Sequence, residues 1–312
     1  MSGGRMRWRW LLMPLLLLLA LPVALLALLA SSSGTESLVR QATELARPAG
    51  IELSFEHSAG NMLGQLELSG LVFEGVDTPV QIARLLLDWQ PRALFDRRVH
   101  VRAFELAGVR LTPPAASERG PEPLQIPDLR LPLALQVDRL LLEQVVIEQP
   151  DGPLAVERIA ASVSLDEGGL VFRDLQFAGA GARLEGDLSL QAVAPHALGG
   201  RLTGQVDSEL SGDAIGPVMA RARLSGQALR PAFDLAIEAP ARLNLRGTFA
   251  LDRQQPGFDL AADWDELSWP LHGEPQVTAR DGQLGLEGNV GDYRITLQTA
   301  LHSGELEPGD IT

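Results

Sequence analysis

A strict alternation of apolar and polar residues constrains the fold of this chain more than any other feature. In one clear example, Phe233, Leu235 and Ile237 alternate with Asp234 and Glu238. Successive side chains of a β-strand point to opposite faces, so this pattern puts the apolar side chains on one face and the polar ones on the other. It recurs in segment after segment beyond residue 180 and predicts a mostly antiparallel sheet that is apolar on one face only.

The apolar face of this predicted sheet has no helical cover, because no long amphipathic helix is predicted after residue 50. Such a sheet can close into a barrel, pair with a second sheet or curl into a trough, and the alternation alone leaves all three open. Residues of one parity should then face a common apolar interior. The candidate site residues of this kind are Leu188, Leu190, Leu202, Val206, Phe233, Leu235, Leu243, Leu245, Phe249, Tyr293, Ile295 and Leu297.

The N-terminus carries a different signal. Three arginines within residues 1–10 precede an uncharged apolar run over residues 11–30. Twenty helical residues span ~30 Å, the hydrocarbon thickness of a bilayer, so we expect a basic cytoplasmic tip followed by a transmembrane anchor. Arginine is retained on the cytoplasmic side, which places the body outside. The alternative is a cleaved signal peptide, but the apolar run is long for one and Leu28 lies where a small residue is preferred.

The rest of the chain divides by composition. Residues 31–50 should form a polar break and a short amphipathic helix, because Ser33 and Glu36 match a capping box. Residues 51–114 read as a first β unit with a short helix at 91–97 and a strand pair hinged near Gly108. A Pro-, Ser- and Gly-rich loop follows at 115–123, and 124–312 reads as one long sheet with turns at 166–169 and 280–282.

Composition excludes several classes of function. The net charge of −14 argues against nucleic-acid binding and against a basic membrane-surface patch. The absence of cysteine excludes disulfides, thiol catalysis and cysteine-ligated metals. The five histidines lack metal-ligand spacing, and no GxSxG nucleophile motif occurs. We therefore expect that the protein is not an enzyme and that it binds no cofactor.

Three segments together resemble one protein family. After the anchor come GNMLGQLELSGLVFEG at Gly60–Gly75 and a long strand-rich stretch at Val80–Leu111. Near the end, Asp263–Leu301 combines a Trp-Pro-Leu sequence, an acidic glycine turn and a Tyr-centred strand. This order is similar to the N-terminal part of TamB proteins, in the AsmA-like superfamily.

The resemblance implies an all-β fold in which a transmembrane helix precedes an elongated, taco-like β-sheet with a hydrophobic groove. It implies an inner-membrane anchor, a periplasmic body, and phospholipid passage toward the outer membrane through contact with acyl chains. The implied protein partner is the outer-membrane barrel TamA, reached through a C-terminal part that this chain, an expected N-terminal fragment, lacks. An alternative is an assembly factor that helps insert outer-membrane β-barrel proteins, its sheet edge templating incoming strands.

Overall fold

The computed structural model describes residues 52–311 except 62–63, 75–78, 113–125, 127, 150–151, 254, 273, 290 and 304–305. This part of the chain is all-β, as predicted: it holds seventeen strands and two short helices, η2 (Pro91–Asp96) and α3 (Ser208–Ser211). The expected basic tip, anchor and amphipathic helix within residues 1–50 lie outside the described residues. Within the described ranges, no helix is long and apolar enough to cross a bilayer.

The chain forms two compact units. The first unit comprises the chain up to Ala116 together with Gln136–Arg158, and the second unit comprises the remainder. One boundary between the units falls at Ala116, within the loop expected at 115–123, and Gln136–Arg158 groups with the earlier strands. The reason is packing: Leu142 and Val145 are buried in the same unit as the apolar residues before residue 112. The expected loop at 115–123 lies entirely outside the described residues.

The first unit is built from antiparallel strands. Its strands are β1 (Glu52–Ser54), β2 (His57–Gly60), β3 (Gln65–Glu74), β4 (Val80–Gln90), β5 (Arg98–Leu111) and most of β6 (Ala134–Ile147). Strands β1 and β2 pair with successive parts of β3, and β3, β4, β5 and β6 follow as neighbours. The predicted short helix at 91–97 is confirmed by η2, which connects β4 to β5.

The apolar face of the first unit is closed to solvent. Register places Leu66 opposite Leu87, and Leu87 opposite Phe104, so that one parity of each strand meets the same parity of the next. All three side chains are buried, and the largest fully buried ones in the described residues also belong to this unit. Burial of this aliphatic face is the principal stabilising contribution in the unit.

One sequence expectation in this unit is wrong. Gly108 does not hinge two strands but lies inside the single strand β5. It has a φ of +64°, which only glycine adopts readily, and a Cβ added there would lie 2.7 Å from the Cβ of Ala83. A local irregularity within a continuous strand therefore produces the glycine signal that resembles a hinge.

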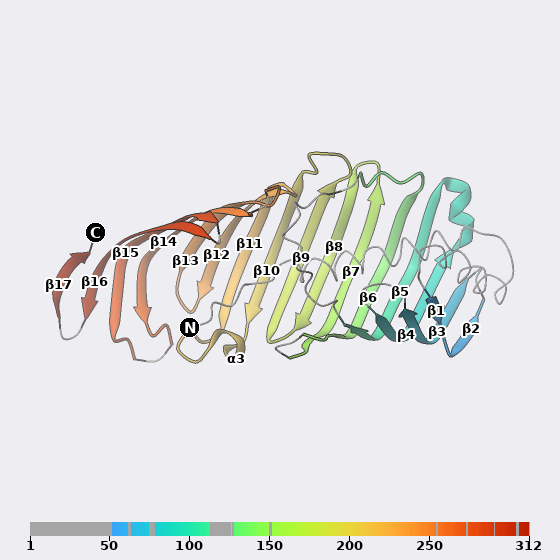
Figure 1. Ribbon diagram of the computed structural model, residues 1–312, viewed down its shortest axis with the longest axis horizontal. Coiled ribbons are helices and arrows are strands. Elements are labelled where there is room, and N and C mark those ends of the chain that lie inside the picture. Colours follow the sequence, from blue (N-terminus) through green and yellow to red (C-terminus); the bar gives the residue numbers. More distant parts are fainter. Residues whose placement is uncertain are drawn as a thin grey trace. The chain divides into compact units, whose positions relative to one another are not determined.

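The second unit is an antiparallel meander in chain order (Figure 1). It contains the end of β7 and all later strands. Their bounds are β7 (Leu154–Asp166), β8 (Gly169–Gly179), β9 (Ala182–Gln191), β10 (Leu198–Val206), β11 (Val218–Gln227), β12 (Arg230–Ala239), β13 (Leu243–Ala250), β14 (Gly257–Trp269), β15 (Val277–Asn289), β16 (Asp292–Ser303) and β17 (Leu306–Ile311).

The two turns predicted for this unit differ in outcome. The first is confirmed: β7 and β8 meet at 166–169, where Asp166 Oδ1 accepts a hydrogen bond from the Gly168 amide at 2.8 Å. The second is wrong, because residues 280–282 lie inside β15. There Asp281 has a φ of +50°, and the pairing with β16 shifts register between Arg280 and Gln283. The acidic glycine sequence forms a bulge instead of a turn.

The contrast between closed and open apolar positions predicts two different responses to the same substitution. Leu85 is 0% exposed, so Leu85→Ala should reduce the stability of the first unit by about 2–5 kcal/mol. Leu297 is 48% exposed, so Leu297→Ala should cost about 1 kcal/mol or less in the second unit. Hydrogen exchange of backbone amides in β4 and β16 measures each unit separately. Equal losses at the two positions would contradict this description.

Candidate functional site

Strands β9 to β16 carry one continuous apolar face. Side chains directly opposite each other in neighbouring strands lie on the same face, so the register can be followed across the sheet. One such row runs through Leu188, Gly200, Leu224, Phe233, Gly247, Leu260, Leu286 and Ile295. The row contains only apolar residues and glycine, although it crosses eight strands.

The next row on the same face is apolar as well. It runs through Gly186, Leu202, Ala222, Leu235, Leu245, Ala262, Leu284 and Leu297. The remaining predicted residues join this face through their pairings: Leu190 with Leu198, Val206 with Val218, Leu243 with Ile237, Phe249 with Phe258, and Tyr293 with Gly288. The structure thus brings all twelve candidate residues to one face, while their contact with a lipid stays a prediction.

This face remains open to solvent, unlike the apolar face of the first unit. None of the twelve side chains is buried, and Tyr293 and Ile295 are each 58% exposed. Folded monomers seldom expose a contiguous apolar patch larger than a few hundred Å² unless it binds something. A face of this extent is therefore the strongest candidate binding surface in the described part of the chain.

Glycines let the large side chains of the face lie close to the sheet. A Cβ added at Gly200 would lie 2.6 Å from Leu188 Cδ2, because the leucine leans across the opposing glycine. At Gly247 an added Cβ would collide with Leu260 and would lie 3.0 Å from Phe233 Cε1. Large residues and glycines thus interlock along the row.

Aromatic side chains make close contacts at two places on the face. The rings of Phe233 and Phe249 stack with centroids 5.7 Å apart and an interplanar angle of 19°. The indole of Trp264 covers Gly282 on the opposing strand, and its Nε1 atom is buried without a hydrogen-bond partner. These contacts fix the local shape of the face, but most of it is lined by aliphatic side chains.

The sequence prediction missed several residues of this face. Leu260, Leu284 and Leu286 lie between the predicted positions in the two rows. Leu284 and Leu286 alternate with Gly285 and Glu287, so the period-two signal was present but weak. The positions of Leu286 opposite Ile295 and of Leu284 opposite Leu297 depend on register with another strand, which parity within one strand cannot supply.

The opposite face of these strands is polar and carries solvated ion pairs. Arg294 Nη1 donates to Glu287 Oε1 at 2.7 Å, and an oxygen of Glu238 lies 3.0 Å from Arg221 Nη1. These side chains are largely exposed, so each pair contributes about 0–1 kcal/mol at most. Exposed pairs of this kind keep the polar face hydrated.

Two carboxyl groups in the second unit have lowered pKa values. Hydrogen bonds from Arg230, with Nε at 3.0 Å, lower the pKa of the Asp252 carboxyl. A side-chain hydrogen bond from Arg130 lowers the pKa of Asp128 to about 2. Both shifts come from exposed pairs with arginine, so neither carboxyl has the raised pKa of a general acid.

The described residues offer no centre for metal chemistry, since no three His, Cys, Asp or Glu side chains among them are grouped to hold an ion. Two histidines are engaged elsewhere: the buried His196 places Nδ1 3.0 Å from the Gln191 carbonyl oxygen, and His100 Nε2 lies 2.7 Å from Asp138 Oδ2. Asp263 lies inside β14 and accepts a hydrogen bond from Asn244 at 3.0 Å.

The interlocking of large residues with glycine predicts opposite effects for two glycine substitutions. An added methyl at Gly247 would also lie 2.9 Å from the Asp259 carbonyl oxygen, so Gly247→Ala should destabilise the unit by about 1–3 kcal/mol. At Gly285 the nearest atom is Thr296 Cβ at 3.8 Å, so Gly285→Ala should stabilise the strand by about 0.5–1 kcal/mol. Hydrogen exchange distinguishes the two, and destabilisation by both variants would refute the interlocking arrangement.

A comparison with family models assigns the chain. The model described as TamB, N-terminal domain, matches residues 21–188 and 120–312. No solved structure matches the chain significantly. Because the two family matches together extend from residue 21 to the last residue, the chain belongs to the TamB family, through its N-terminal domain.

Proposed function

We propose that the apolar face of β9 to β16 is the floor of a groove that carries phospholipid acyl chains across the periplasm. The observation that carries this proposal is the open, unbroken apolar face with a polar face behind it. Family membership supports a role in the bacterial envelope. The finer statements, that the sheet curls into a taco-like groove and that lipid moves toward the outer membrane, belong to this proposal.

The energetics favour an acyl chain as the ligand. Moving roughly sixteen methylenes out of water is worth ~13 kcal/mol, at ~0.8 kcal/mol each. A lipid that crosses an aqueous compartment needs apolar surface along its whole path to avoid that loss. Eight strands at ~4.8 Å spacing extend ~34 Å, which exceeds the half-thickness of a bilayer core that one acyl chain spans. The face is therefore long enough to hold a chain without exposing its end.

The shape of the lining fits passage better than tight binding of a single ligand. Leucine and glycine make up most of the two rows, and aromatic residues make up only 5% of the chain. Tight pockets usually add a few convergent polar groups that fix orientation, and the two apolar rows contain none. A lipid on such a face would be held by burial alone, which is non-directional and permits sliding.

Anchoring and partners complete the proposal. The apolar run at 11–30 would hold the protein in the inner membrane, with the N-terminus cytoplasmic and the body periplasmic. The outer-membrane barrel TamA would be the protein partner. We assign no catalytic role and no cofactor. The alternative, an assembly factor for outer-membrane β-barrels, would need an unpaired strand edge in place of an open apolar face.

Photo-crosslinking in cells tests the groove. Crosslinkers at Phe233, Leu245 and Ile295 should label phospholipid, because these side chains lie on the open apolar face. Crosslinkers at the neighbouring residues lie on the polar face and should not label phospholipid. These residues are Asp234, Arg246 and Arg294. Mass spectrometry of the crosslinked lipid provides the measurement, and each pair differs by one residue on the same strand.

Charge substitutions on the two faces of one strand test whether the apolar face is needed for lipid passage. Leu245→Asp should block lipid passage, because a carboxylate on the apolar face repels an acyl chain from that point. Arg246→Asp makes a comparable change on the polar face and should leave passage intact. Hydrogen exchange must show that both variants are folded. Equal labelling of the two faces, or full function in folded Leu245→Asp, would favour the assembly alternative.

A further inference from the structure

The turn between β4 and β5 projects an unprotected apolar side chain into solvent. Phe95 is 91% exposed, more than any other large hydrophobic residue among those described. Its neighbour Leu94 is exposed too, and both belong to η2, the cyan coil in Figure 1. A single exposed aliphatic residue is common on protein surfaces, but a fully exposed phenylalanine beside a leucine at a tip suggests a contact surface.

The charge around this tip is opposite in sign to that of the chain. Arg92, Arg97 and Arg98 accompany one acid, Asp96, within residues 91–98, although the whole chain carries −14. All four of these side chains are exposed. The net charge is a sum over the whole chain, so it argues against a basic membrane-surface patch only on average. It does not show the positive charge of this short segment. Arginines around exposed apolar residues match a lipid surface, where guanidinium groups meet phosphates and apolar groups enter below them.

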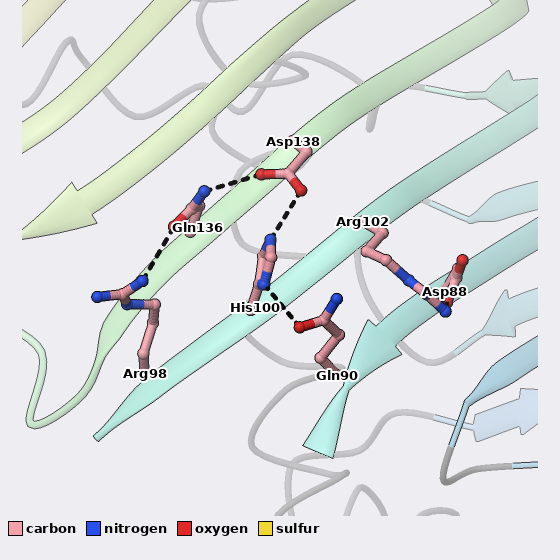
Figure 2. A network of polar contacts seen from close by, with 7 residues as sticks. All are labelled: Asp88, Gln90, Arg98, His100, Arg102, Gln136 and Asp138. Carbon is pink, nitrogen blue, oxygen red and sulfur yellow. Dashed lines mark hydrogen bonds and ion pairs between the residues drawn. The ribbon is translucent and has the colours of Figure 1, made fainter. Parts of the chain in front are cut away.

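Hydrogen bonds hold the tip in one shape. Arg97 takes a left-handed φ of 54° and its amide donates to the Leu94 carbonyl oxygen at 3.0 Å. Behind the tip, a polar network connects β4, β5 and β6 (Figure 2). In it, His100 Nδ1 lies 3.2 Å from Gln90 Oε1, and Arg98 Nη1 donates to Gln136 Oε1 at 3.5 Å. A tip that is ordered in advance loses less conformational entropy on binding.

We propose that the Pro91–Arg98 tip docks on a bilayer surface that contains anionic phospholipid. Phe95 and Leu94 enter the headgroup boundary, while Arg92 and Arg97 face lipid phosphates. Two observations favour a bilayer as the binding partner: the positive charge of the tip and the short stretch of chain between the proposed anchor and the first strand. Only residues 31–51 separate the proposed anchor from β1, and they span at most ~75 Å. The tether keeps the tip at high effective concentration near the bilayer. This inference rests on the anchor of the proposed function but not on its groove.

Fluorescence quenching tests the docking in the full chain. The chain contains no cysteine, so Phe95→Cys introduces a single site for an environment-sensitive fluorophore. In vesicles of phosphatidylethanolamine and phosphatidylglycerol, the label should shift to the blue and be quenched by nitroxide lipids. Both effects should be lost in phosphatidylcholine alone, because its surface carries no net negative charge. A label at Leu210→Cys, exposed on α3, is the matched control and should remain unquenched.

Arginine variants separate the electrostatic contribution. With the label at residue 95, Arg92→Gln should lower the ratio of docked to free tip about fivefold. Arg246→Gln removes an exposed arginine from β13 and should leave the ratio unchanged. Equal quenching at residues 95 and 210, or insensitivity to Arg92→Gln, would overturn the proposal. Groove crosslinking at Ile295 reports separately, so loss of one result without the other shows which proposal fails.

Discussion

The pairing of a large apolar side chain with a glycine on the next strand is the constraint on which the open face depends. Leu188 leans over Gly200, and Phe233 and Leu260 both lean over Gly247. Such pairs fill the surface of a single sheet without a second layer of side chains above it. They also require fixed register, because a slip of one residue would bring charged side chains to the apolar face.

The same alternation of apolar and polar residues serves a different purpose in each of the two units. In the first unit, side chains such as Leu85 are fully buried and the aliphatic face stabilises the fold. In the second unit, Ile295 and its row neighbours stay accessible to solvent. A ligand that covers these side chains removes them from water, and that transfer favours binding. An antiparallel meander extends such a face strand by strand with short connections, which suits a long path better than a compact pocket.

How far the sequence predicts this structure depends on whether a signal is local. Parity within a strand is local, and it placed residues such as Leu245 on the apolar side without knowledge of their neighbours. Register is not local, so the position of Leu286 beside Ile295 was missed. The predictions at Gly108 and Asp281 were wrong because a residue with positive φ can lie inside a strand as well as in a turn. The tip at Phe95 was missed because net charge averages over the chain.

A nitroxide scan along β13 tests the central claim most directly. Single cysteines at each position from 243 to 249 except Gly247, in an otherwise cysteine-free chain, can carry one spin label each. With a phospholipid labelled on its acyl chain, dipolar broadening should alternate with a period of two. It should be strong at the parity of Leu245 and weak at the parity of Arg246, because only the first faces the proposed lipid. Uniform or absent broadening along the strand would contradict the account.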